Sequence, residues 1–228
     1  MRAARPDAAR PLGPAAGLRR EYLAALLAPD SARARDLVVG SLEDGVPAAD
    51  LYLRVLAPAM HDIGRLWERA EISVAQEHVA TQITQGVLAQ LAHRITRASR
   101  SGEGRTALVA CTPGERHALG AQMVADFLEA DGWDVQVAPP GTDVDDLMLG
   151  AEVRTPDVIA LSTALPHSLL NATRTFAALR RLPNRPLLIA GGQAYGGDAN
   201  RARVVGADLF ADDLEALLEQ VAESLPAR

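Results

Sequence analysis

The residues best suited to chemistry follow apolar runs in the second half of the chain. Glu115, His117 and Gly120 form an E-x-H-x-x-G pattern shortly after the run 106–111. A neutral imidazole is a good ligand for a transition metal, and a carboxylate two residues away can orient the ring and raise its basicity. Gly120 leaves space for a bulky ligand or a closely packed helix. Taken alone, the pattern also fits a solvated loop histidine.

Two further features occupy equivalent places. Ser162 and Thr163 follow one apolar run, and Gly191 and Gly192 follow the next. The carboxyl ends of parallel strands meet at one edge of a sheet, where ligands of open α/β folds bind. Hydroxyls and bare glycines at successive strand ends therefore predict a deep slot that receives a long, flexible group.

A parallel sheet is needed to bring these residues together. After residue 104, β-rich runs alternate five times with helical patterns, which predicts a flavodoxin-like (Rossmann-like) five-stranded parallel domain with helices on both faces. The strands are expected at 106–111, 133–137, 158–161, 187–189 and 207–210. The helices are expected at 119–129, 144–153, 168–182, 199–205 and 213–225.

The first half has a helical period instead. Apolar residues recur at three- and four-residue steps, which predicts four helices at about 18–27, 31–42, 48–67 and 73–97. Short turns between them favour an antiparallel four-helix bundle, with Pro58 expected to kink the third helix. The predicted organisation is a disordered tail, a helical bundle, a small polar linker and the α/β domain, at residues 1–16, 17–97, 98–104 and 105–228.

Composition excludes several classes of protein. The chain has 228 residues, 48% of them hydrophobic and 23% charged, which is incompatible with wholesale disorder. The formal net charge of −6 argues against binding nucleic acid through a generally basic surface. A single cysteine, Cys111, excludes an internal disulfide, and the lack of lysine excludes Schiff-base catalysis. We expect a cytoplasmic protein without a membrane span or signal peptide.

With these motifs in order, Arg105 to Leu225 resembles the cobalamin (vitamin B12)-binding domain. The resemblance implies that His117 replaces the cofactor's own base as the lower axial ligand of cobalt, and that Ser162 hydrogen-bonds the displaced nucleotide tail. The commonest form of the motif begins with Asp rather than Glu. The cofactor-binding residues implied in this domain are Glu115, His117, Gly120, Ser162, Thr163, Gly191 and Gly192.

The helical half resembles a particular branch of that family. Trp67 is followed by nine residues and then by Glu77-His78, a spacing similar to that of the CarH-type adenosylcobalamin photoreceptors. In that branch the helical bundle caps the upper face of the corrin. The resemblance implies that Trp67 and Val74 pack on the 5′-deoxyadenosyl group and that Glu77 and His78 help to hold it. A flat indole and a carboxylate suit a nucleoside.

The chain also departs from that branch. The photoreceptor repressors carry a DNA-binding helix-turn-helix domain before the bundle, whereas this chain has an Arg- and Pro-rich segment there, so direct DNA binding is not expected. Glu68 replaces the histidine that follows the tryptophan, which leaves His61 and His78 as alternative ligands after photolysis. Some relatives of this architecture also carry a bilin, a second tetrapyrrole, for which Cys111 is a poor attachment site.

The predicted function is a cobalamin-binding light sensor. We expect the protein to form a homodimer or homotetramer. Photolysis of the cobalt–carbon bond is expected to change its conformation or oligomeric state and so to regulate an effector protein. No catalytic constellation is apparent, so we expect no enzyme activity. The alternative is a corrinoid carrier protein for methyl transfer. A response-regulator or dinucleotide-binding domain is disfavoured, because the sequence lacks the lysine of the former and the G-x-G-x-x-G pattern of the latter.

Overall fold

The chain folds into two compact units. The computed structural model describes residues 13–95, 102–211 and 214–225. Its contacts divide the chain into Met1–Leu91 and Ala92–Arg228. Of the predicted disordered tail, residues 1–12 lie outside the described residues. Residues 13–16 belong instead to the first helix, so that helix begins earlier than expected.

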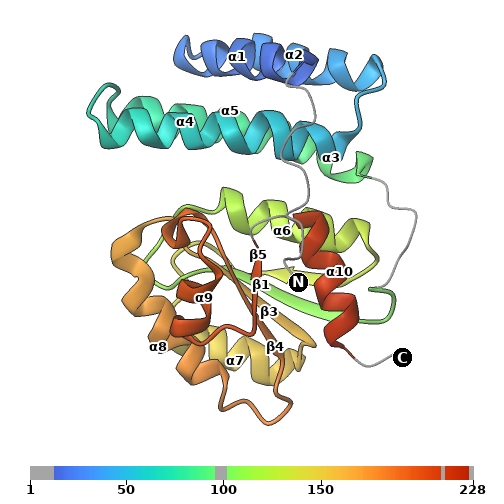
Figure 1. Ribbon diagram of the computed structural model, residues 1–228, viewed down its shortest axis with the longest axis vertical. Helices are drawn as coiled ribbons and strands as arrows, with labels where there is room; N and C mark the ends of the chain where they lie inside the picture. The colour runs from blue at the N-terminus through green and yellow to red at the C-terminus, as the bar shows by residue number, and fades with distance from the viewer. Residues whose placement is uncertain (1–12, 96–101, 212–213, 226–228) are drawn as a thin grey trace, which may run out of the picture. The chain divides into compact units, whose positions relative to one another are not determined.

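The described part of the first unit is helical throughout (Figure 1). Its elements are α1 (Gly13–Leu27), α2 (Ser31–Glu43), α3 (Ala48–Leu51), a π-helical turn (Tyr52–Leu56), α4 (Ala57–Glu68) and α5 (Val74–Leu91). Because α3, the π turn and α4 run on without a break, they form one long helix. The four-helix arrangement predicted for this half is therefore confirmed. The predicted fourth helix ends at Leu91, and a short 3₁₀ turn, Ala92–Arg94, follows in the second unit.

Pro58 does not break the long helix. A proline inside a helix has no N–H to donate, and its ring crowds the carbonyl four residues earlier. Here the turn before it widens to π geometry, and the Ala57 N–H donates to the Tyr52 carbonyl. The wider turn accommodates the ring, so the expected disturbance takes the form of a local π bulge.

Two buried tyrosines tie the helices together through their hydroxyls. The Tyr22 hydroxyl donates to Thr84 Oγ1 over 3.1 Å, which links α1 to α5. Burial raises the pKa of Tyr22 to about 12, so the phenol remains a neutral donor. The Tyr52 hydroxyl donates to the Leu88 carbonyl over 3.1 Å. These bonds satisfy polar groups that would otherwise be costly in the bundle core.

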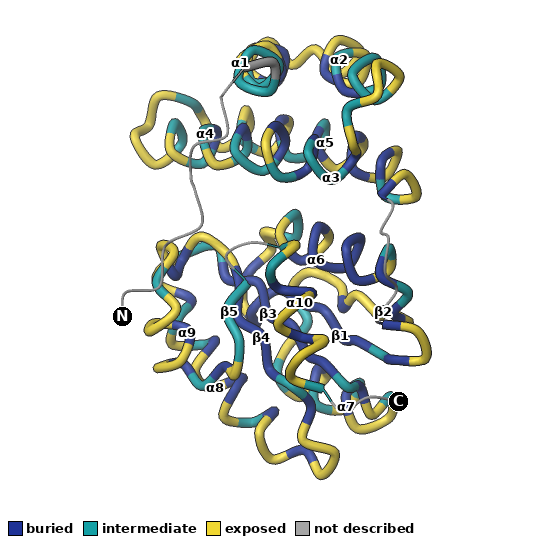
Figure 2. Tube along the Cα trace, turned by 45° about the vertical axis from the view of Figure 1, so that its right-hand side comes forward, coloured by how far each residue is buried: buried dark blue, intermediate teal, exposed yellow. Residues whose placement is uncertain are grey.

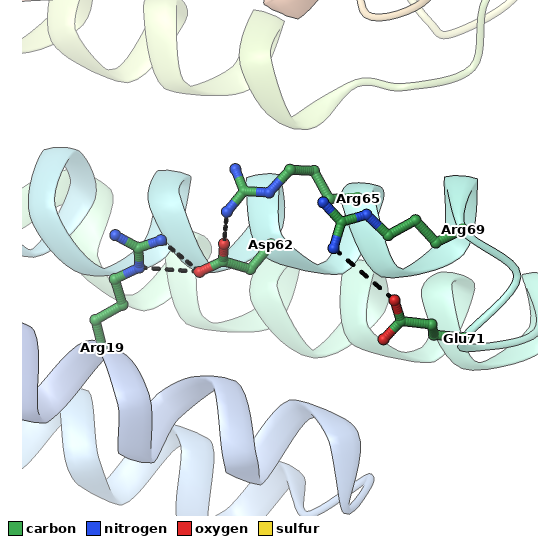
Figure 3. Close-up of polar contacts among 5 residues, drawn as sticks. All are labelled: Arg19, Asp62, Arg65, Arg69 and Glu71. Carbon is green, nitrogen blue, oxygen red and sulfur yellow. Dashed lines mark hydrogen bonds and ion pairs between the residues drawn. The ribbon is translucent and has the colours of Figure 1, made fainter.

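A charged link joins α1 to α4 at the surface of the unit (Figure 3). Arg19 Nε donates to Asp62 Oδ2 over 3.1 Å, and Arg65 forms a second ion pair with the same carboxylate. The Asp62 side chain is only 16% exposed. One aspartate is thus shared by two arginines, and the Arg19 bond links α1 to α4.

The turn between α4 and α5 has a left-handed residue that is not glycine. The Ala70 N–H donates to the Trp67 carbonyl and the Glu71 N–H to the Leu66 carbonyl, both over 2.9 Å, which is the Schellman pattern of a helix end. Ala70 has a φ of 55°. A Cβ in this conformation is strained, whereas glycine adopts it freely.

Ala70→Gly should therefore stabilise the protein, by about 0.5 to 1 kcal/mol, because it removes the left-handed strain without changing a contact. The measurement is urea unfolding followed by circular dichroism. Ala89→Gly, at an exposed position inside α5, is the matched control and should destabilise by about 1 kcal/mol. Equal losses in both variants would contradict the strain at Ala70.

The second unit alternates strands and helices. Its strands are β1 (Thr106–Cys111), β2 (Asp134–Val137), β3 (Val158–Ser162), β4 (Leu187–Gly191) and β5 (Leu209–Ala211). Its helices are α6 (Leu119–Ala130), α7 (Val144–Arg154), α8 (Leu169–Leu179), α9 (Ala199–Val205) and α10 (Leu214–Ser224). Short 3₁₀ turns, Pro166–Ser168 and Gln193–Tyr195, precede α8 and follow β4.

The described strands form one parallel sheet in the order β2-β1-β3-β4-β5. This is the flavodoxin-like order, so the predicted fold class is confirmed. Helices α6 and α10 contact each other, while α7, α8 and α9 contact in series on the other side of the sheet (Figure 1). The register pairs Cys111 with Ser162 and Ser162 with Gly191, so the ends of β1, β3 and β4 lie side by side.

The core lies on both faces of the three central strands. From Ala107 onward β1 is buried, as are β3 and most of β4, whereas the edge strands are more exposed (Figure 2). Helices cover both faces of the sheet, so these strands read as continuous apolar runs rather than alternating ones. This explains why their positions were predictable to within two residues.

The end of the predicted linker belongs to the second unit. Residues 98–101 lie outside the described residues, but Gly102 is buried beside Trp133. A Cβ at Gly102 would lie 1.9 Å from Trp133 Cδ1, and the Gly102 N–H donates to the Asp131 carbonyl over 3.1 Å. Residues 102–104 are therefore a packed part of the α/β unit rather than a free connection.

Candidate functional site

The loops that follow β1, β3 and β4 are joined by a buried chain of hydroxyls. Thr112 Oγ1 lies 2.7 Å from Thr163 Oγ1, which lies 3.2 Å from the Tyr195 hydroxyl. All three residues are fully buried. Burial is also the main cause that raises the pKa of Tyr195. These neutral hydroxyls hold the carboxyl edge of the sheet in one arrangement.

His117 stands at this edge with its ring exposed. It lies two residues before α6, and its carbonyl accepts a hydrogen bond from Cys111 Sγ over 3.5 Å. Burial, and then the charge of Glu115, raise the pKa of the Cys111 thiol to about 11, so it stays protonated as a donor. Within the described residues the imidazole itself has no hydrogen-bond partner. The backbone is anchored while the ring remains free to bind a metal.

Glu115 does not make the contact expected of it. The residue is 2% exposed, and its carboxylate accepts the backbone N–H groups of Ala164 and Leu165 over 2.8 and 2.9 Å. Among the described residues, no hydrogen bond joins Glu115 to His117. The expected orientation of the histidine by this carboxylate is thus absent, because the longer Glu side chain reaches across to the loop after β3.

Gly120 and Ser162 meet at the start of α6. A Cβ at Gly120 would lie 2.7 Å from Ser162 Oγ, so a side chain there would press on the serine. Ser162 is 7% exposed, and its hydroxyl makes no hydrogen bond to another described residue. A free hydroxyl beside a bare glycine suits the entry of a polar ligand chain; the cofactor-binding role of the two residues stays a prediction.

The two glycines after β4 have different surroundings. Gly192 has a φ of 107°, and a Cβ there would lie 2.3 Å from the Thr163 carbonyl oxygen. A Cβ at Gly191 would lie 3.3 Å from the Ala211 Cβ, a tight but milder contact. Gly192 is thus required by the approach of the backbone after β3. Thr163, predicted to line the slot, uses its hydroxyl within the buried chain instead.

The predicted residues of the helical unit lie around the α4–α5 turn. Trp67 is half-buried near the end of α4, and Val74 is 50% exposed at the start of α5. Glu77 Oε1 accepts the Thr81 hydroxyl over 2.9 Å, and its other oxygen lies 3.7 Å from His78 Nε2. Val74, His78 and Thr81 share one stripe of α5, because they are spaced four and three residues apart. Val74 and Glu77, three residues apart near the start of α5, also lie on neighbouring positions of the helix surface.

Thr112 and Tyr195 were missed by the sequence analysis. Thr112 directly follows the first strand, and Tyr195 follows the Gly-Gly pair by three residues. Their positions at strand ends were the available signal. Asn171 was also missed; its side-chain amide donates to the Pro113 carbonyl over 3.1 Å and so ties α8 to the loop after β1.

The fold and its edge define a doubly wound domain in which an exposed histidine, a bare glycine and a serine hydroxyl without a described hydrogen-bond partner follow the carboxyl ends of β1 and β3. Two family patterns, each described as a B12 binding domain, match residues 18–92 and 105–222. The chain therefore belongs to the B12-binding domain family. Cobalt in a corrin needs only one protein ligand, and His117 offers a free imidazole; the residues present fit the cofactor.

The chain is similar to three proteins that carry further information. It is 32% identical over 177 residues to the HTH-type transcriptional repressor CarH of Myxococcus xanthus, a match that covers 77% of this chain and 58% of that protein. It is 27% identical over 178 residues to an uncharacterized 20.5 kDa protein of the bchF-crtJ intergenic region of Rhodobacter capsulatus, covering 77% of this chain and 92% of that protein. The structure of the Methanosarcina barkeri monomethylamine corrinoid protein superposes with a TM-score of 0.80 at 19% identity, over 92% of this chain and 99% of that one, which shows the shared fold.

No helix in the described residues is long and apolar enough to cross a membrane.

His117→Ala tests the predicted cobalt ligand and should weaken cobalamin binding by on the order of tenfold or more. The absorption spectrum of the bound corrinoid should revert to that of a form without protein ligation. His93→Ala, at an exposed position of the 3₁₀ turn after α5, is the control and should leave both properties unchanged. An unaltered spectrum in the His117 variant would exclude this residue as the ligand.

Proposed function

We propose that this protein is a light sensor that uses adenosylcobalamin. The observation that carries the proposal is that Trp67, near the end of α4, and Val74, Glu77 and His78, at the start of α5, lie on either side of one connecting turn, in a chain that matches CarH along 77% of its length. A methyl group on cobalt would be too small to cover both an exposed valine and a half-buried indole. A deoxyadenosyl group offers a flat base and ribose hydroxyls, for which Trp67 and Glu77 are suited.

Each unit has its own part in the proposal. When bound, adenosylcobalamin supplies a cobalt–carbon bond that visible light breaks. His117 would hold the cobalt, and the Ser162 hydroxyl would hydrogen-bond the displaced nucleotide tail. Trp67 and Val74 pack on the adenosyl group, while Glu77 accepts hydrogen bonds from its ribose. His78 lies beside Glu77, and its side chain is 66% exposed. It is therefore accessible to hydrogen-bond the adenosyl group or, after photolysis, to ligate cobalt.

Loss of the adenosyl group would remove the contacts made by the helical unit. Such a loss shifts a conformational equilibrium only by the difference in binding energy between its two states. In this proposal the arrangement of the two units changes. Homo-oligomer formation changes with it, and an effector protein responds. The predicted linker, residues 98–104, is the hinge of this proposal, except for residues 102–104, which are packed in the α/β unit. The protein acts as a sensor rather than as an enzyme, and it works in the cytoplasm without binding DNA directly.

The test is an absorption spectrum of the protein loaded with adenosylcobalamin in the dark, repeated after green light, with size-exclusion chromatography of both samples. The expected result is irreversible photoconversion together with a change in elution. A bound corrin whose photolysis leaves the size and shape of the protein unchanged would favour the methyl-transfer carrier instead. Addition of methylcobalamin then decides that case, since a carrier should bind it at least as tightly as the adenosyl form.

Trp67→Ala should weaken adenosylcobalamin binding by about tenfold or more, because a large aromatic contact is lost, and should leave hydroxocobalamin binding within about twofold. Isothermal titration in the dark measures both. A milder matched pair is Val74→Ala against Val79→Ala, two exposed valines on different sides of α5. Only the first should weaken adenosylcobalamin binding. Equal weakening of both corrinoids by Trp67→Ala would contradict the adenosyl contact.

A further inference from the structure

We propose that Glu115 is a positioning residue for the slot that receives the nucleotide tail, and that it does not orient His117. This inference rests on the proposed binding mode, in which His117 ligates cobalt and the tail enters between the strands. It assigns the motif carboxylate to the loop after β3, where it acts through the backbone of Ala164 and Leu165.

The geometry commits both oxygens of the carboxylate. Oε2 accepts the Ala164 N–H over 2.8 Å and Oε1 accepts the Leu165 N–H over 2.9 Å. The side chain is almost completely buried, and hydrogen bonds from backbone N–H groups to a buried carboxylate are among the stronger ones in proteins. The same two N–H groups would otherwise be without helix or sheet partners, because they follow the end of β3.

In the proposed binding mode, the segment that Glu115 holds, Ala164 and Leu165, forms the β3 side of the slot. Ala164 and Leu165 directly follow Ser162 and Thr163, and the Thr163 backbone is the surface against which Gly192 packs. A second bond, from the Asn171 side-chain amide to the Pro113 carbonyl, joins the loop after β1 to α8, the helix that follows this segment. Movement of the segment would therefore shift the Ser162 hydroxyl and the Gly192 peptide, which the binding mode places along the tail.

His117 is held by other means. Its carbonyl accepts the buried Cys111 thiol, and its ring has no partner within the described residues. A substitution that disrupts the Glu115 contacts should then affect the tail more than the cobalt ligand. Cobinamide separates the two effects, because it is the same corrinoid without the nucleotide tail.

The experiment compares aquocobalamin and aquocobinamide binding to the wild-type protein and to Glu115→Gln. Glutamine keeps the shape but replaces one acceptor oxygen with an NH₂ group that faces a backbone N–H. Cobalamin affinity should fall by about tenfold or more, whereas cobinamide affinity should stay within about twofold. Equal loss of both corrinoids would show that Glu115 acts on His117, and loss of neither would show that it positions nothing; either result overturns the inference.

Controls separate positioning from folding. Asp157→Asn is matched, because the Asp157 carboxylate accepts the Thr106 N–H over 2.8 Å at the opposite edge of the sheet; it should leave the ratio of the two affinities unchanged. Amide hydrogen exchange of the cofactor-free protein measures the two hydrogen bonds to Glu115 directly. Glu115→Gln should speed exchange at Ala164 or Leu165 by about tenfold. Unchanged exchange at both amides would also overturn the inference. If the wild-type protein binds both corrinoids but shows no response to light, only the proposed function fails.

Discussion

Thr163 uses every polar group that it has to hold three loops together. Its N–H donates to the Gly191 carbonyl over 2.8 Å, its carbonyl accepts the Ala194 N–H over 3.1 Å, and its hydroxyl bonds to Thr112 and Tyr195. The rest of the edge depends on this residue. Gly192 must be a glycine because the Thr163 carbonyl lies so close, and Ser162 remains free because its neighbour supplies the links. A preformed edge of this kind reduces the ordering that a ligand has to bring about.

The fold was predictable from the sequence for a simple physical reason. Strands covered on both faces are apolar at every position, and helices show a clear three- to four-residue repeat, so both periods are visible without a structure. The chemistry of the carboxyl edge was predictable in part, since Ser162 and Gly192 lie where β3 and β4 end and Gly120 packs against Ser162 from the start of α6. Their common placement follows from the strand order, in which β3 lies directly beside β1.

What the sequence could not reveal depends on contacts between distant residues. The reach of Glu115 to Ala164 spans 49 positions and exists only because β1 and β3 are neighbours. In the sequence, the same glutamate stands beside His117 and suggests a partnership that the structure does not contain. Gly102 is a similar case: in a run of small polar residues it reads as linker, yet its lack of a side chain is what allows Trp133 to pack there. The π turn before Pro58 has no sequence signal beyond the proline itself.

The position of Cys111 has a practical consequence. It is the single cysteine of the chain, it lies inside the sheet, and its thiol remains protonated and hydrogen-bonded. Reagents that attack thiolates will therefore prefer a cysteine introduced at the surface. Pairs of spectroscopic labels can be attached to the helical and α/β units without first removing the native thiol. Distances between the two units, with and without corrinoid and in darkness or light, then become accessible in the otherwise unaltered protein.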